Sequence, residues 1–289
     1  ERAACSSHGQ SLQDHKQGAV LGIASAPGGM LLTCGEDSSL ALYCTSDPSE
    51  PPKQLRGHSK AVNRVVVGRK TLMAYSCSRD TTCCQWKLPE TFGSGLSVQA
   101  PTQVYRGHSL TSSAVALSTD ESHLCSGSRD TTVIVRDVGT GTLVAQAKTP
   151  RNLVTCLKYI PGEEVIAQGG EDLKLRLWDM RQEMGKPCQV IDNFTYFPLC
   201  VDTHADGIHL LTSSKGFNGV GCEGRLWDRR TGALVVEYKG HEQDATGCCF
   251  LPSGFANQKP SVVSVSKDST VKVWDQATAE LLIDHTESR

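Results

Sequence analysis

The sequence predicts an all-β fold assembled from six copies of one short unit. The clearest copy runs from Ser261 to Asp275, SVVSVSKDSTVKVWD, where a β-branched run, a turn at Lys267-Asp268-Ser269 and a second run ending in Trp-Asp predict two paired strands. The turn recurs at positions 37, 80, 130, 172, 221 and 268, so successive copies are 42 to 50 residues apart. Repeats of about this length, with Gly-His before the paired strands and Trp-Asp after them, are typical of four-stranded propeller blades.

Three further positions keep the same register in most copies. An aromatic residue follows the turn Asp by six positions at Tyr43, Trp86, Trp178 and Trp274. Asp130 is followed at that distance by Arg136, and the fifth copy, which ends at Trp227-Asp228, has Gly221 in place of the turn Asp. Ser or Thr precedes the turn Asp by four positions at Thr33, Ser76, Ser126 and Ser264. A His follows Gly upstream of the paired strands at His58, His108 and His241, with His15 as a weaker counterpart.

This pattern resembles the WD-repeat (WD40) family over nearly the whole chain. The resemblance implies an all-β WD40 β-propeller with six four-stranded repeats, either as a six-bladed ring or as a seven-bladed ring that lacks one blade. We expect residues 1–14 to form a tail or a segment at the seam, and residues 15–289 to form the propeller.

In the WD40 family, His, Ser or Thr, Asp and Trp of one repeat form a buried chain of hydrogen bonds. The resemblance implies complete sets at His58, Ser76, Asp80 and Trp86 and at His241, Ser264, Asp268 and Trp274, and partial sets at His108, Ser126 and Asp130 and at His15, Thr33, Asp37 and Tyr43. Such a satisfied network fixes one packing of a blade. The fourth and fifth repeats lack the His, so we expect apolar packing to hold them.

The strands can be placed in order along the chain. In the first repeat we expect them near residues 18–24, 30–35, 39–44 and 52–56, with residues 47–52 as an exposed connector. The second repeat runs from 57 to 87 and is followed by an insert at 88–102, the third from 107 to 137, and the fourth from 152 to 179. Gly139-Thr140-Gly141 predicts a hairpin turn into a strand at 143–147, and residues 280–284 predict the last strand.

The fifth repeat is irregular, because Ser213 to Gly224, SSKGFNGVGCEG, replaces a tight turn with a long Gly-rich loop. A phosphate-binding loop would need a helix after it, and a strand is predicted there instead. We therefore interpret the segment as an adapted β-bulge loop and name Gly216, Phe217 and Asn218 as candidate partner-binding residues.

Composition excludes several classes of protein. The chain has 289 residues and a formal net charge of −2, which gives no overall basic field for nucleic acid or an anionic membrane. No run of 18 apolar residues predicts a membrane-spanning helix. The 13 cysteines contain no CxxC pair, and we expect them to be reduced thiols packed as small apolar side chains in a cytoplasmic protein. Because the sequence begins at Glu1, we expect native residues to precede it.

No arrangement for catalysis or cofactor binding is apparent. The repeat distributes the turn aspartates and the histidines one to a blade, beyond the reach that an acid–base pair needs. The sequence contains neither G-x-S-x-G nor H-E-x-x-H, and no local cluster of Cys and His ligands. We therefore predict a non-enzymatic protein that binds no cofactor, metal, nucleic acid or small-molecule substrate and does not insert into a membrane.

Protein binding is the function that remains. The resemblance implies that the residues just before the turn Asp lie on one face of the propeller, namely Glu36, Arg79, Arg129, Glu171 and Lys267. The three cations against the two anions would divide this face by charge and steer an acidic partner segment to one side. The alternative is that these are ordinary solvated turn residues.

Repeats three to six resemble a narrower group of WD-repeat proteins that is associated with cilia. The carriers are residues 128–130, 151–155, 171–172, 175–179, 216–217, 221–223, 226–228 and 237–241, with the Gly-rich insert as the most specific part. The resemblance implies a scaffold in the cytoplasm and the cilium or flagellum, acting in axonemal assembly or ciliary trafficking. Its partners would be subunits of ciliary or axonemal complexes.

A second function stays open because the fourth and fifth repeats end in WDxR, with Arg181 and Arg230 in the last position. Residues 166–181 are similar to the box found in WD-repeat substrate receptors of cullin-based ubiquitin ligases, where the Arg contacts the adaptor. Gln168 stands where that box has a small residue. The alternative function is therefore that of a ubiquitin-ligase substrate receptor.

Overall fold

A computed structural model describes residues 18–47, 49–92, 100–149, 151–252 and 259–286. Within these ranges all the regular elements are β-strands, which form six sheets of four. In every sheet the four strands follow one another along the chain and pair antiparallel, so each repeat is one four-stranded blade. The predicted all-β fold of six four-stranded repeats is confirmed. None of the described residues belongs to a helix that is long and apolar enough to cross a membrane.

The chain divides into two compact units, and the first, Glu1–Arg106, contains blades 1 and 2. Blade 1 consists of β1 (Val20–Ala26), β2 (Met30–Gly35), β3 (Ser39–Cys44) and β4 (Lys53–Arg56). Blade 2 consists of β5 (Val62–Val67), β6 (Met73–Ser78), β7 (Cys83–Lys87) and β8 (Gln103–Tyr105). Residues 1–14 and His15 lie outside the described residues.

The second unit, Gly107–Arg289, contains blades 3 to 6. Blade 3 consists of β9 (Ser112–Leu117), β10 (His123–Ser128), β11 (Thr132–Asp137) and β12 (Leu143–Lys148), and blade 4 of β13 (Val154–Tyr159), β14 (Val165–Gly170), β15 (Lys174–Asp179) and β16 (Gln189–Ile191). Blade 5 consists of β17 (Pro198–Thr203), β18 (His209–Ser214), β19 (Gly224–Asp228) and β20 (Ala233–Tyr238). Blade 6 consists of β21 (Ala245–Phe250), β22 (Ser261–Ser266), β23 (Thr270–Asp275) and β24 (Leu281–Thr286).

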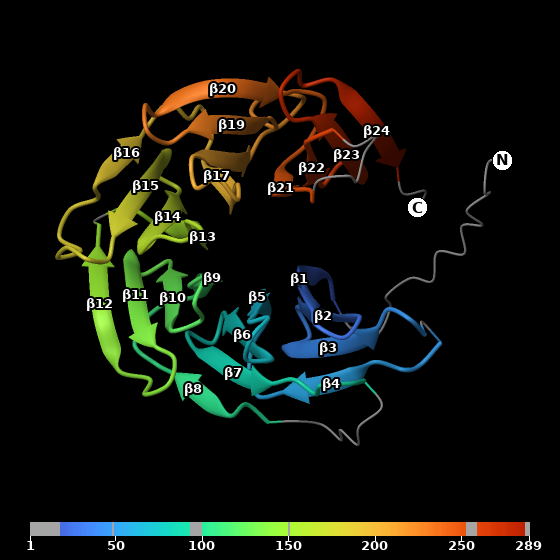
Figure 1. The fold of residues 1–289 in the computed structure, drawn as a ribbon, viewed down its shortest axis with the longest axis vertical. Helices are drawn as coiled ribbons and strands as arrows, with labels where there is room; N and C mark the ends of the chain where they lie inside the picture. The colour runs from blue at the N-terminus through green and yellow to red at the C-terminus, as the bar shows by residue number, and fades with distance from the viewer. Residues whose placement is uncertain (1–17, 48, 93–99, 150, 253–258, 287–289) are drawn as a thin grey trace. The chain divides into compact units, whose positions relative to one another are not determined.

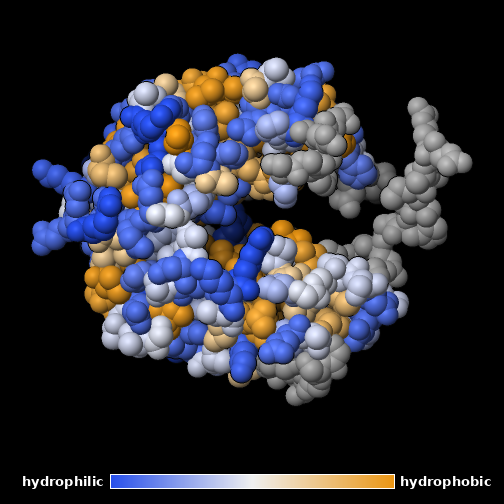
Figure 2. Space-filling model, in the orientation of Figure 1, coloured by the Kyte–Doolittle hydropathy of each residue, from blue (hydrophilic) through white to orange (hydrophobic). Residues whose placement is uncertain are grey.

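Within the second unit, the first strands of neighbouring blades contact one another, and Figure 1 shows β9, β13, β17 and β21 on the inner side with β12, β16, β20 and β24 on the outer side. Middle strands are buried on both faces, and all six residues of β14 are buried. Outer strands face solvent, and Figure 2 shows hydrophobic residues at the outer edge over β12 and β20, where Leu143, Val144, Leu234 and Val235 are exposed.

Apolar side chains of adjacent blades pack together between the sheets. One core cluster joins blades 3 and 4 around Trp178, a second joins blades 4 and 5 around Trp227, and a third joins blades 5 and 6 around Trp274. Seven of the described cysteines are buried, six of them in strands and Cys222 in the loop before β19, and all the described cysteines are free thiols.

The observed strands differ slightly from the predicted ones at their ends. β1 starts two residues later than expected, and β24 extends to Thr286 rather than ending at Asp284. The predicted hairpin at Gly141 is present, since Gly141 N–H donates to Asp137 O (2.9 Å) with φ at +74°. These ends depend on turn hydrogen bonds that a periodic pattern does not encode.

Candidate interaction site

The hydrogen-bonded chain of blade 6 fixes the connection that enters this blade. His241 Nε2 lies 2.7 Å from Ser264 Oγ, and Trp274 Nε1 donates to the same Oγ at 2.9 Å. His241 Nδ1 lies 3.1 Å from Asp268 Oδ2, and the N–H of Glu242 donates to that oxygen at 2.9 Å. One carboxylate therefore holds both the buried ring and the backbone that follows it.

The ionisation of this chain follows from its burial and its partners. Burial lowers the pKa of His241 more than Asp268 raises it, so the ring is neutral at pH 7. Burial raises the pKa of Asp268, but donors from Thr270 and Glu242 outweigh it and bring the pKa to about 2. Both nitrogens of the neutral His and both oxygens of the carboxylate are occupied by hydrogen bonds within the blade. These side chains therefore have a structural role.

Two other blades have the same arrangement. In blade 2, His58 lies 2.8 Å from Ser76 Oγ and 2.9 Å from Asp80 Oδ2, and Trp86 Nε1 donates to Ser76 Oγ at 2.8 Å. In blade 3, which lacks the Trp, His108 lies 2.9 Å from Ser126 Oγ and 3.2 Å from Asp130 Oδ2. In blade 1, Thr33 Oγ1 donates to the backbone oxygen of Ala41 (3.3 Å), and Asp37 accepts from Ser39.

Blade 4 lacks the His, and it has a buried polar network in addition to the apolar packing that was expected to be its main support. The side-chain amides of Asn152 and Gln168 hydrogen-bond to each other at 3.0 and 3.2 Å, and Trp178 Nε1 donates to Gln168 Oε1 at 3.1 Å. Both amides are buried, so an amide pair replaces His and Ser. In blade 5, Trp227 Nε1 donates to Thr212 Oγ1 at 2.9 Å. The buried indole N–H needs an acceptor in each case.

The Gly-rich loop of blade 5 lies on the connection that enters blade 6. Gly219 N–H donates to Glu242 O at 3.1 Å, and Gly216 N–H donates to Asp244 Oδ1 at 3.1 Å. Phe217 also forms an isolated β-bridge with Gln243. Because Glu242 is held by Asp268, the buried chain of blade 6 also positions this loop.

The tip of the loop is a two-residue β-hairpin, which differs from the predicted β-bulge loop. Phe217 and Val220 exchange both backbone hydrogen bonds, at 2.9 and 3.1 Å, across Asn218-Gly219. The turn residues have φ of +51° and +74°, the conformation for which Asn-Gly is favoured. The dipeptide Asn-Gly between two apolar residues was the available sequence signal for this hairpin.

The loop is packed tightly beneath its tip. Gly221 has a φ of +82°, and a Cβ atom there would lie 2.0 Å from the ring of Tyr196, in the connection before β17. The glycine in place of the turn Asp therefore allows an aromatic ring to support the loop. This close packing, rather than a phosphate cradle, explains that glycine.

The hairpin presents two apolar side chains to solvent. Phe217 is 68% exposed and Val220 is 56% exposed. Beside them, Asp244 Oδ2 accepts from Lys267 Nζ at 2.7 Å. Burial raises the pKa of Asp244, but the hydrogen bonds from Lys267 and Gly216 N–H together lower it by more. The net pKa is therefore below its usual value. We call Phe217, Val220, Asp244 and Lys267 the hairpin surface.

Two of the cations that were predicted to divide one face by charge form ion pairs within the second unit. Arg129 Nη1 lies 3.1 Å from Glu171 Oε1, so these opposite charges from blades 3 and 4 are paired instead of separated. Lys267 is likewise paired with Asp244. In the first unit, Glu36 accepts from the backbone N–H of Ala19 at 3.3 Å. Arg79 is exposed in the turn between β6 and β7.

Arg181 and Arg230 lie at the opposite end of their blades from the hairpin surface, in the connections between the third and fourth strands. Each guanidinium folds back on the Asp of its own Trp-Asp pair. Arg181 bonds Asp179 at 2.9 and 2.6 Å, and Arg230 bonds Asp228 at 3.2 and 2.8 Å. Both side chains are exposed, but their donors are engaged within the turn.

The repeats define the class of this protein. The family described as WD domain, G-beta repeat matches residues 6–44, 49–87, 99–137, 141–179 and 232–275. The chain therefore belongs to the WD40 family, whose propellers are generally non-catalytic and bind proteins. The stretch between 179 and 232, which is not matched, contains the first three strands of blade 5.

Several curated proteins are similar to this chain. Nuclear distribution protein nudF of Aspergillus niger is 24% identical over 292 residues, which cover 94% of this chain and 62% of that protein. Guanine nucleotide-binding protein subunit beta-5b of Danio rerio is 26% identical over 263 residues, covering 88% and 62%. Pre-mRNA-processing factor 19 of Mus musculus is 25% identical over 154 residues, covering 53% and 29%. The chain spans less than two thirds of the length of these relatives.

Proposed function

We propose that this protein is a non-catalytic scaffold that binds a protein partner through the hairpin surface of blades 5 and 6. The observation that carries the proposal is Phe217, a large apolar side chain that is 68% exposed. Its backbone is held by two hydrogen bonds to Val220 and by the bond from Gly216 N–H to Asp244. Large exposed aromatic side chains are the usual anchors of protein interfaces. The hairpin surface is therefore assigned to partner binding.

The rigidity of the hairpin supports this assignment. A side chain on a preformed hairpin loses little backbone entropy on binding, because Asn218-Gly219 and the bond to Glu242 already fix it. Burying a Phe side chain contributes roughly 2–3 kcal/mol. The partner that fits is a folded protein with an apolar pocket for Phe217 and a polar rim facing Asp244 and Lys267.

We further propose that the partners are subunits of ciliary or axonemal complexes, met in the cytoplasm and the cilium. The support is the resemblance of repeats three to six to ciliary WD-repeat proteins, in which the Gly-rich insert is the most specific part. That insert is the loop that carries Phe217. Relatives in the same family have names as different as splicing, nuclear-distribution and G-protein subunits, so the fold alone does not select the partner.

The test is affinity purification of the full-length protein from ciliated cells, followed by mass spectrometry and by binding measurements on the recovered partner. Phe217→Ala should weaken binding about tenfold or more without changing the thermal midpoint. Val235→Ala is the matched control, because Val235 is an exposed apolar residue on the outer strand of the same blade.

Other outcomes would redirect the assignment. Equal partner recovery by Phe217→Ala and the unchanged protein would contradict the hairpin surface as the binding site. Stoichiometric recovery of a cullin adaptor, lost in Arg181→Ala or Arg230→Ala, would instead establish the substrate-receptor function. Recovery of partners without any ciliary subunit would overturn the ciliary assignment while leaving the scaffold function intact.

A further inference from the structure

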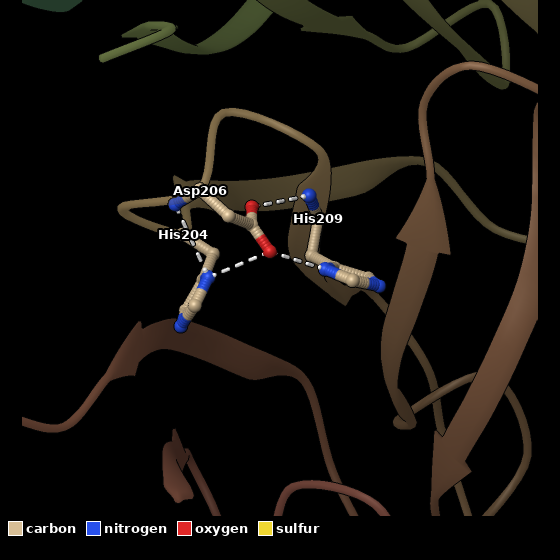
Figure 3. Close-up of side chains that lie close together, drawn as sticks. All are labelled: His204, Asp206 and His209. Atoms are coloured by element: carbon tan, nitrogen blue, oxygen red, sulfur yellow. Dashed lines mark hydrogen bonds and ion pairs between the residues drawn. The ribbon is translucent and has the colours of Figure 1, made fainter. Parts of the chain in front are cut away.

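The turn between β17 and β18 brings two histidines and an aspartate together, at the end of blade 5 opposite the hairpin surface. Figure 3 shows both imidazole rings beside one carboxylate. His204 Nδ1 lies 2.9 Å and His209 Nδ1 lies 2.7 Å from the same oxygen, Asp206 Oδ2. These three atoms lie within 4.8 Å of one another.

The turn holds the carboxylate in this orientation. Asp206 Oδ1 accepts from the backbone N–H groups of Ile208 (2.7 Å) and His209 (3.0 Å), which leaves Oδ2 to the two rings. The backbone closes between His204 N–H and His209 O at 2.9 Å. Gly207 supplies the left-handed residue of the turn, with φ at +67°. The ligand oxygen is therefore fixed before anything binds.

The rings are oriented as well. His204 packs edge-on against Phe250 of β21, with ring centroids 5.0 Å apart. Its Nδ1 also lies 3.3 Å from the N–H of Asp206, so this nitrogen points into the turn (Figure 3). Neither Nε2 atom is engaged by another described residue in a hydrogen bond. Both rings can therefore carry their proton on Nε2, which directs the Nδ1 lone pairs into the turn. A bound ion would replace the 3.3 Å hydrogen bond from the Asp206 N–H to His204 Nδ1.

The carboxylate is a charged ligand. An Asp side chain is ionised near pH 7, and the backbone N–H groups of Ile208 and His209 hold this carboxylate through Oδ1. An ionised carboxylate oxygen between two imidazole nitrogens is a donor set that suits zinc and other divalent transition metals.

We propose that this turn is a binding site for a divalent transition metal ion, with His204 Nδ1, His209 Nδ1 and Asp206 Oδ2 as ligands and zinc as the ion that fits best. All three side chains are about one-third exposed, so water completes the coordination of the ion. Tetrahedral metal–ligand bonds of roughly 2.0–2.2 Å need ligand atoms roughly 3.3–3.6 Å apart. Each nitrogen, now 2.9 or 2.7 Å from Asp206 Oδ2, would therefore move away from that oxygen when the ion binds. The H-x-D-x-x-H motif is not a cluster of Cys and His ligands, because one of its three ligands is an Asp.

The corresponding turn of blade 3 provides an internal comparison. Asp120 and His123 occupy the equivalent positions, and Glu164 of blade 4 lies 3.9 Å from His123 Nδ1. Here Ser118 and Ser122 donate to both oxygens of Asp120 at 2.6 Å, and Ser122 Oγ also lies 2.8 Å from His123 Nδ1. With one imidazole and a carboxylate already saturated by hydroxyl groups, this turn is a weaker ligand set.

The test is calorimetric titration of the full chain with zinc chloride in a buffer that does not bind zinc, with a non-thiol reductant. The expected result is one site, weakened tenfold or more in both His204→Ala and His209→Ala, and unchanged in the control His123→Ala. Titration with cobalt separates the ligand types, because thiolate ligation gives an intense near-ultraviolet charge-transfer band and His–carboxylate ligation does not. Burial raises the pKa of Cys249, at the end of β21, to about 11, which disfavours the thiolate form.

Unchanged thermal midpoints will show that the variants fold, since all three substitutions lie in turns or at a strand end. Absence of binding at about 100 µM zinc, a concentration on the order of the dissociation constant of a weak imidazole site, would overturn the proposal. It would also be overturned by zinc binding that survives both His204→Ala and His209→Ala, or by a thiolate spectrum with cobalt. None of these results depends on the partner that the hairpin surface binds.

Discussion

Blades 6 and 4 of the second unit each bury a Trp at the same position of the repeat, but they supply its indole N–H with different hydrogen-bond acceptors. In blade 6, Trp274 donates to the hydroxyl of Ser264, which also contacts His241. In blade 4, Trp178 donates to the amide oxygen of Gln168, which pairs with Asn152. The requirement common to both is an acceptor for a buried N–H, and the residues that supply it can change together.

The two pairs of side chains can replace each other because their combined lengths are similar. His is long and Ser is short, whereas Asn is short and Gln is long, so the sum of the two side chains still spans the blade. Blade 4 also has Gly170, where a Cβ atom would lie 1.7 Å from Asn152 Oδ1, and blade 6 has Ser266 at the corresponding position. The turn Asp172 bonds Arg176 instead of a His. The two blades therefore differ at several contacting positions at once, while the acceptor for the buried indole is kept.

The largest expected effect comes from breaking the amide pair with Gln168→Leu, which nearly preserves volume. Trp178 Nε1–H and the Asn152 amide would lose their partner while buried, and the free energy of unfolding should fall by about 3 kcal/mol. Urea denaturation of both proteins measures it. Gln182→Leu, at an exposed Gln of the same blade, is the control and should change stability by less than about 0.5 kcal/mol.

A loss below about 1 kcal/mol for Gln168→Leu would mean that blade 4 is held by apolar packing after all, as its missing His suggests. The comparison with blade 6 would then fail, because the amide pair would be incidental to the stability of the blade.

A smaller effect is expected from Ser264→Ala in blade 6. The change removes the oxygen shared by Trp274 Nε1 and His241 Nε2, and we expect a loss of about 2 kcal/mol in the free energy of unfolding. Ser264→Thr is the matched control, because Thr212 supplies the same hydroxyl to Trp227 in blade 5. If Ser264→Thr destabilises as much as Ser264→Ala, the hydroxyl is not what stabilises the blade.

The sequence predicts the blades well because their signals are local. Each pair of middle strands is joined by a short turn, and period, turn residues and Trp-Asp endings coincide within about 15 residues, as in Ser261–Asp275. The complete sets of His, Ser, Asp and Trp in blades 2 and 6 follow from the same register. The resemblance supplied their hydrogen bonding, which spacing alone does not.

The candidate site was harder to predict because its contacts join distant parts of the chain. Gly219 bonds Glu242, and Arg129 bonds Glu171 in the next blade, so neither contact shows as a local pattern. Gln168 shows a different difficulty. It occupies the position of Ser264, but the repeat lacks the His, and an amide pair has no repeating signature from which a network could be predicted.

The smallest expected effect is a difference in pH dependence between the two networks. Burial lowers the pKa of His108 and of His241 below the ordinary value of 6.5, despite the neighbouring Asp130 and Asp268. The unfolded chain therefore binds protons more readily than the folded one at these sites. Their contribution to stability is complete above pH 6.5 and decreases as the pH falls below it. The amide pair of blade 4 does not titrate in this range.

Urea denaturation at pH 7.5, 6.5 and 5.5 should therefore show a free energy of unfolding that decreases as the pH is lowered. The decrease should be smaller in His241→Asn, which removes one of these histidines. Asn152→Ala is the control, because it lowers stability at every pH through the buried amide of Gln168 but leaves the dependence on pH unchanged. An equal slope in His241→Asn and the unchanged protein would show that the buried ring does not couple folding to protons. The two networks would then differ in geometry but not in their response to acid.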